Sequence, residues 1–109
     1  MSNYLLIESR DPFESHDTKF LAETAVTLAH RGHQVTIFLI QNGVLASRCQ
    51  AQESSLPQLL TAGITILADD FSLCERGIRA EELRTGIQPV AIETLVEALV
   101  EQDTKAIWH

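Results

Sequence analysis

The sequence predicts a single α/β domain over residues 1–109, with a mainly parallel sheet of about five strands and helices on both faces. Apolar runs typical of strands alternate along the chain with stretches typical of helices. Two runs, Val35–Ile40 and Ile64–Ala68, are almost wholly apolar, as in strands that are covered on both faces of a parallel sheet. A length of 109 residues fits one domain. The expected architecture is a three-layer, Rossmann-type arrangement.

The remaining strands are expected in shorter apolar runs. Asn3–Glu8 (NYLLIE) predicts a strand, and Thr104–Trp108 (TKAIW) predicts another. Gly86–Pro89 predicts a turn, in which Pro89 can take the first position of the helix that follows.

Four segments predict helices. The first is His16–Arg31, with Ser15 as N-cap and Gly32 as the residue that ends it. The others are Leu56–Thr61, a short helix capped by Asp69 and Asp70, and an amphipathic helix from Ile92 to Val100. Val44–Ser55 is expected to be part helix and part loop.

Composition excludes several functions. Fifteen acidic residues against eight basic ones give a net charge of −7, and the basic residues form no stripe. Direct binding to nucleic acid or to an anionic membrane is therefore disfavoured. No apolar run is long enough to cross a bilayer, and no signal peptide is recognisable. Two cysteines in such a chain favour the reducing cytoplasm.

No standard cofactor or metal motif is present. Neither the Gly-x-Gly-x-x-Gly nor the Walker pattern occurs, and no set of histidines, cysteines and acids has the spacing of metal ligands. We therefore expect no cofactor and no metal.

Three loops are expected to share one edge of the sheet. Ligands of open parallel sheets bind at the carboxyl ends of the strands. The loops that follow strands there are Ser9–Ser15, Gln41–Val44 and Asp69–Arg76. The candidate ligand- or partner-binding residues near this edge are His16, Gln41, Asn42, Gly43, Asp69, Asp70 and Arg76.

Each candidate also has a purely structural interpretation. Asn42 and Gly43 suit a tight turn that tolerates positive φ, with or without a ligand. Asp69 and Asp70 could act as acid and base or hold a metal, but one could equally cap the next helix while the other faces solvent. His16 could donate a proton to a ligand or simply face solvent.

Four stretches together resemble the DsrE/DsrF superfamily. They are DPFES, AHRGHQVTIFLIQNGV, AGITILADDFSLCERGI and KAIWH, and the most specific pieces are Gln41–Val44 and Arg76-Gly77-Ile78. This superfamily includes the small sulfur-relay proteins of the DsrEFH and TusBCD complexes. The resemblance implies a compact α/β domain assembled into homo- or hetero-oligomers, here a homotrimer or a hexamer. It also implies a persulfide-carrying cysteine directly after the third strand, a position that Asp69 occupies in this chain.

Cys74 is the candidate catalytic residue, although it lies one turn further along. It could accept a persulfide sulfur from a donor protein and pass it to an acceptor. It could instead be a small core residue, because helical spacing places it with Phe71 and Ile78 and predicts a partly covered thiol. Cys49 could be a resolving cysteine or have no task.

Three functions therefore remain open. The first is a sulfur-relay subunit that acts through protein partners. The second is a non-catalytic, oligomeric module on the same fold that binds a small ligand or a partner. The third is an acid–base or metal-dependent enzyme that uses Asp69, Asp70 and His16. Whether the protein is an enzyme stays open.

Overall fold

The sheet has five parallel strands and confirms the α/β fold. A computed structural model describes residues 3–10, 17–48, 56–101 and 104–108. The strand order is β4-β3-β2-β1-β5, and every neighbouring pair is parallel. The strands are β1 (Asn3–Glu8), β2 (Gln34–Leu39), β3 (Thr65–Asp69), β4 (Ile87–Val90) and β5 (Thr104–Trp108).

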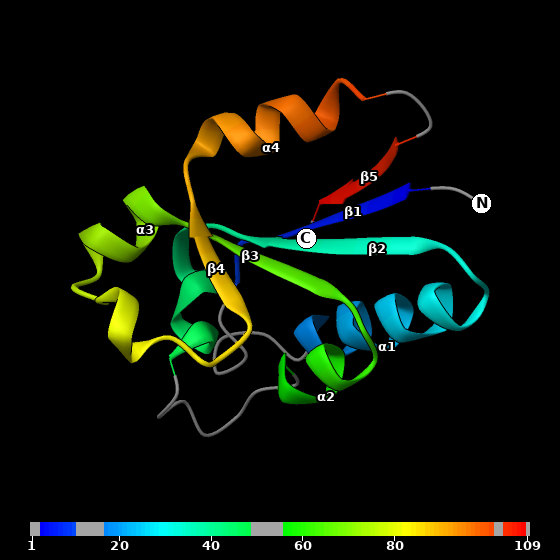
Figure 1. Cartoon of the computed structure of the whole chain (residues 1–109), viewed down its shortest axis with the longest axis horizontal. Coiled ribbons are helices and arrows are strands. Elements are labelled where there is room, and N and C mark those ends of the chain that lie inside the picture. Colours follow the sequence, from blue (N-terminus) through cyan, green and yellow to red (C-terminus); the bar gives the residue numbers. More distant parts are fainter. Residues whose placement is uncertain (1–2, 11–16, 49–55, 102–103, 109) are drawn as a thin grey trace.

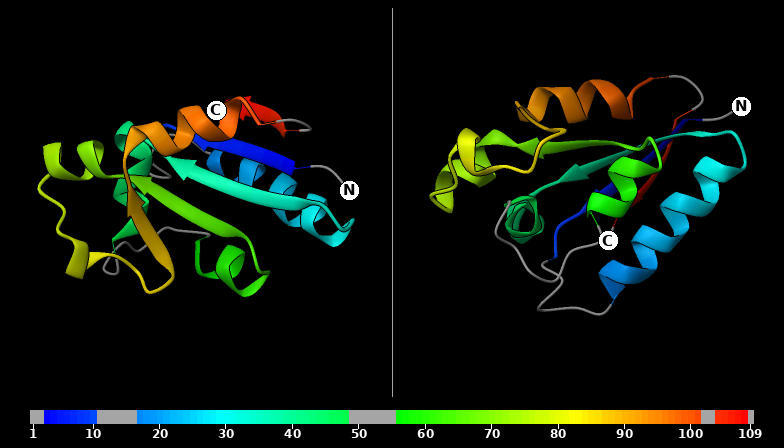
Figure 2. Two further views of the ribbon diagram at one scale, coloured as in Figure 1. Left: turned by 45° about the horizontal axis from the view of Figure 1, so that its top comes forward. Right: turned by 60° about the horizontal axis from the view of Figure 1, so that its bottom comes forward.

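Helices cover both faces of the sheet, as the sequence predicts. In Figure 1, α1 and α2 lie on one face and α4 lies on the other, while α3 lies beyond the carboxyl ends of the strands. The tilted views of Figure 2 show the resulting three layers. The helices are α1 (Asp17–His30), α2 (Leu56–Thr61), α3 (Asp70–Glu75) and α4 (Ile92–Leu99), with 3₁₀-helices η1 (Gln41–Ser47) and η2 (Ala80–Glu82).

The core has two parts because side chains of a strand alternate between faces. Leu6 of β1 belongs to the larger cluster, which packs against α1 and α2. Leu5 and Ile7 belong to the smaller cluster, which packs against Leu95 of α4. Both faces of the central strands are thus buried, which explains why their sequences are almost wholly apolar.

One predicted turn is a strand. Gly86–Pro89 was expected to be a turn, but Ile87–Val90 forms β4 and pairs with β3. β4 is an edge strand, where a proline without an N–H is tolerated. Only Ile87 of this strand is buried, so its sequence carries little of the apolar signal that reveals a strand.

Residues 44–47 extend the Gln41–Gly43 turn rather than forming a separate element, and Arg48 forms an isolated antiparallel bridge with Leu83. The 3₁₀-helix η1 begins at Gln41, immediately after β2 and Ile40. The rest of the Val44–Ser55 segment, including Cys49, lies outside the described residues.

The predicted amphipathic helix is present as α4, but most of its apolar side is uncovered. Leu95 is buried, whereas Ile92, Val96 and Leu99 are 42%, 55% and 43% exposed. We call these three residues the α4 face. Among the described residues, no helix has the length and apolar character needed to cross a bilayer.

Candidate functional site

The loops after β2 and β3 meet at the carboxyl edge of the sheet. The backbone N–H of Gln41 donates to the hydroxyl of Ser72 at 2.9 Å. Asn42 accepts two hydrogen bonds from Arg76. The structure therefore brings together two of the three predicted loops.

The end of β1 joins the same edge. The N–H of Ile40 donates to the carbonyl oxygen of Glu8 at 3.0 Å. A Cβ on Gly43 would overlap that carbonyl oxygen, so the loop can close on β1 only with glycine at this position. Of the third loop, Ser9 and Arg10 are described, and residues 11–16, His16 included, lie outside the described residues.

The turn after β2 uses its residues differently from the expectation. Positive φ was expected at Asn42 or Gly43, but Gln41 has it, at 50°. Gly43 is required for its lack of a side chain and not for its conformational freedom.

Asp69 is a buried helix cap. Its Oδ2 accepts hydrogen bonds from the backbone N–H of Ser72 at 3.1 Å and from the Ser72 hydroxyl at 2.7 Å. Its Oδ1 has no hydrogen-bond partner among the described residues. The capping interpretation of Asp69 is confirmed, whereas Asp70 is exposed in the first turn of α3.

Ser72 connects these groups and was missed in the sequence. It is buried, donates to Asp69 and accepts from Gln41. Its place three residues after a capping aspartate was the available signal, because capped amides lie there. The contact with Gln41 has no local signal, since the two residues are 31 positions apart.

Cys74 is exposed, so the prediction of a partly covered thiol is wrong. Phe71 shares its side of α3 and is 65% exposed, while Leu73 is buried. The error came from extending helical spacing to Ile78. The helix ends at Glu75, and the chain then turns through Gly77, whose φ is 68°, so that Ile78 reaches the core by another route.

Arg76 binds the protein's own loop. Its Nε and Nη2 donate to Oδ1 of Asn42 at 3.2 and 3.0 Å, and its Nη1 donates to the carbonyl oxygen of Ser72 at 3.3 Å. The carboxylate of Glu75 lies 4.0 Å from Nη1. Arg76 and Asn42, both predicted to bind a ligand or partner, therefore bind each other.

The site contains an exposed thiol, that of Cys74. Within the described ranges, no group of three or more histidine, cysteine or acidic residues could hold a metal ion. The chemistry available at this edge is nucleophilic attack by the sulfur of Cys74.

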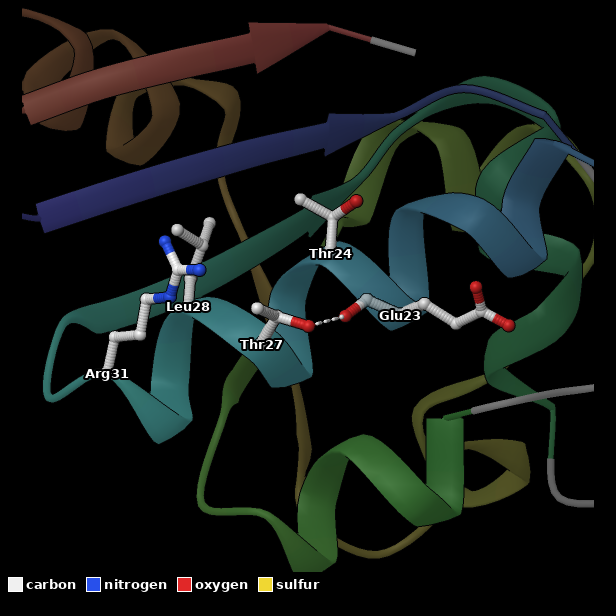
Figure 3. Close-up of a pocket in the computed structure, with 5 residues that line it drawn as sticks. All are labelled: Glu23, Thr24, Thr27, Leu28 and Arg31. Atoms are coloured by element: carbon white, nitrogen blue, oxygen red, sulfur yellow. Dashed lines mark hydrogen bonds between the residues drawn. The ribbon is translucent and has the colours of Figure 1, made fainter.

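A shallow hollow on α1 is separate from this edge. Figure 3 shows its lining residues, which are Glu23, Thr24, Thr27 and Leu28 of α1 and Arg31, the residue that follows the helix. Arg31 lies three residues before β2 begins at Gln34, so the hollow lies towards the edge where the strands begin. In the part of the chain that the structure describes, no second helix or strand contributes a lining residue to this hollow.

Comparison with known proteins identifies the fold. The model of the DsrE/DsrF-like family matches residues 2–105. The YchN protein of E. coli has a similar structure, with a TM-score of 0.87, 17% identity and 100% of each chain covered. MTH1491 from Methanobacterium thermoautotrophicum is also similar, with a TM-score of 0.81 and 16% identity, and the match covers 98% of this chain and 97% of that chain.

BT1422 from Bacteroides thetaiotaomicron gives a TM-score of 0.75 and 22% identity, with 97% of this chain and 94% of that chain covered. MTH1491 and BT1422 are proteins of unknown function. No curated protein sequence matches the chain significantly. At these identities the structural likeness establishes the fold alone, and an argument about activity must come from the residues of the site.

Proposed function

The chain belongs to the DsrE/DsrF-like family, and from this premise we propose that it is a sulfur-relay protein in which Cys74 carries the sulfur as a persulfide. The family suggests a protein of the sulfur-relay type. The observation that carries the finer proposal is the exposure of Cys74 on α3, at the carboxyl edge of the sheet. A carrier thiol must be reachable by the thiol or persulfide of another protein.

The step needs no oxidant, reductant or cofactor. The Cys74 thiolate attacks the terminal sulfur of a donor persulfide, R–S–SH. A bond forms between Sγ of Cys74 and that sulfur, the S–S bond of the donor breaks, and the donor leaves as the thiolate R–S⁻. The product, Cys74–S–SH, passes its outer sulfur to an acceptor thiolate by the same displacement.

The charge of the protein supports protein partners. The net charge is −7, and exposed Asp70 and Glu75 lie on the same short helix as Cys74. Such a surface repels nucleic acid and suits a donor or acceptor protein with basic residues. The proposed step starts from a free Cys74 thiolate, and cysteine thiols stay reduced in the cytoplasm, so the cytoplasm is the proposed location.

Mass spectrometry of the intact protein tests the proposal. After incubation with cysteine persulfide, the protein should gain one sulfur atom. The Cys74→Ser variant should not gain it, and the matched Cys49→Ser variant should. A wild-type chain that gains no sulfur, or a Cys74→Ser chain that gains as much as wild type, contradicts the proposal.

A binding module is the second candidate, and Asp69 favours it. The resemblance implies a cysteine at this position, and here a buried carboxylate caps α3 instead. On this alternative the edge would bind a small ligand or a partner without carrying sulfur. The same mass measurement separates the two candidates.

We further propose that the protein forms a homo-oligomer through the α4 face, a trimer or hexamer being expected from the resemblance. Support comes from the three exposed apolar residues of that face. Trp108 of edge strand β5, 64% exposed, is a further apolar side chain that self-association would cover.

A further inference from the structure

α3 is too short to hold its own shape. It has six residues, and an isolated helix of this length is unstable in water. Leu73 anchors its middle in the core, but Phe71 and Cys74 face solvent and contribute no such anchor. The ends of the helix must therefore be held by other contacts.

The first end is held by the cap. Asp69 binds Ser72 through two hydrogen bonds, and Ser72 accepts a third from the backbone of Gln41. These contacts fix the first turn to the loop that follows β2.

The last turn is held by Arg76. Its guanidinium reaches across to Asn42, 34 residues away in the sequence, and also binds the carbonyl oxygen of Ser72. The Arg76 side chain is 24% exposed, so water competes with these hydrogen bonds only in part. Cys74 lies in this last turn, two residues before Arg76.

We propose that Asn42 and Arg76 are positioning residues for Cys74. By joining the last turn of α3 to the loop after β2, they keep the thiol at a fixed place facing solvent. Displacement at sulfur requires the thiolate to line up with the S–S bond of the donor, and a fixed thiol meets that requirement more often than a mobile one. The inference rests on the proposed function of Cys74. It also assigns a role to Gln41–Val44 and Arg76-Gly77-Ile78, the most specific pieces of the family resemblance.

Loss of the contact should loosen the last turn without unfolding the domain, because Leu73 and the cap remain. A nitroxide label on Cys74, in a Cys49→Ser background, reports this directly. We expect an ordered spectrum in the parent and a mobile one in Asn42→Ala, in Arg76→Ala and in the double variant. The double variant should resemble Arg76→Ala, because both partners act through one contact.

Two conservative changes separate positioning from general stability. Asn42→Asp keeps an oxygen that accepts from the guanidinium and should restore order. Arg76→Lys keeps the charge but cannot donate twice to one oxygen, and should remain mobile. Arg48→Ala is the matched control, since Arg48 donates to the carbonyl oxygen of Leu45 and, among the described residues, makes no hydrogen bond to α3. Its label should stay ordered.

Sulfur uptake from cysteine persulfide, measured without the label, is the second readout. Asn42→Ala should take up sulfur about three- to tenfold more slowly than the parent, and Asn42→Asp should recover the rate.

The outcomes separate the two proposals. If the parent takes up no sulfur, the proposed function is wrong. An ordered label in Asn42→Ala would contradict the positioning role in that case too. If the parent takes up sulfur and Asn42→Ala matches it in order and rate, the positioning role is wrong and the proposed function stands. Circular dichroism checks that each variant is folded. If Asn42→Ala does not fold, Arg76→Lys replaces it in both measurements.

Discussion

At the scale of single residues, Gly43 and Gly32 are glycines for different reasons. Gly43 leaves room for the carbonyl oxygen of Glu8, which a side chain would overlap. Gly32 has open space around it but a φ of 87°, which other residues adopt at a cost. Substitution by alanine at each position therefore tests a different constraint, which is close packing at Gly43 and backbone conformation at Gly32.

We expect Gly43→Ala to lower the free energy of unfolding by about 2–3 kcal/mol, because the loop must move away from the end of β1. Gly32→Ala should cost about 1 kcal/mol, from backbone conformation alone. Urea denaturation measures both. Equal costs, or a larger cost for Gly32→Ala, would show that the loop does not pack against β1 as described.

Single residues were predictable from the sequence only where their partners are close in the chain. A cap at Asp69 or Asp70 was predictable because a capping carboxylate binds an amide only three residues away, as Asp69 does here. The contact between Asn42 and Arg76 was not predictable, because no local pattern links residues 34 positions apart. The sequence placed both at one edge of the sheet, and the structure was needed to show that they bind each other.

At the scale of elements, α3 depends on its cap. Asp69→Ala removes the acceptor for two donors of Ser72 and should lower the free energy of unfolding by about 1–3 kcal/mol. Asp69→Asn keeps a capping oxygen and should cost less than Asp69→Ala. Thermal or urea unfolding provides the measurement.

Asp70→Ala is the matched control. It removes a neighbouring carboxylate that is exposed, and its effect should stay within about 0.5 kcal/mol. If Asp69→Ala proves as mild as Asp70→Ala, the cap does not stabilise α3.

Strands that are buried on both faces were the most clearly predictable elements. β2 and β3 carry almost continuous apolar sequence because both faces of each are covered. β4 was not predicted, because an edge strand with one buried residue, a proline and a polar side chain resembles a turn in its composition. The face of α3 was misjudged for a different reason, since periodicity was extended past the glycine that ends the helix.

At the scale of the whole molecule, the α4 face predicts self-association. Val96 lies in the middle of that face, and Val96→Asp would bury a charge in any apolar contact made there. We expect wild type to form an oligomer at micromolar concentration and Val96→Asp to approach the 12.1 kDa monomer. Light scattering coupled to gel filtration measures both masses.

Gln58→Asp controls for added charge. Gln58 is exposed on α2, on the other face of the sheet, and its substitution should leave the oligomer intact. A monomeric wild type would end the assembly proposal, and an unchanged mass for Val96→Asp would place the contact elsewhere.

The strand order also bears on how the chain is made. β1 is an inner strand only because β5 pairs with its outer edge, Asn3 opposite Thr104 and Ile7 opposite Trp108. A ribosome adds about 5–20 residues per second, so roughly 5–20 s separate the synthesis of the two strands. Throughout that interval an apolar strand keeps one edge open to any extended neighbour. Newly made copies on one messenger are such neighbours, so we expect nascent chains to need spacing or a chaperone until β5 emerges.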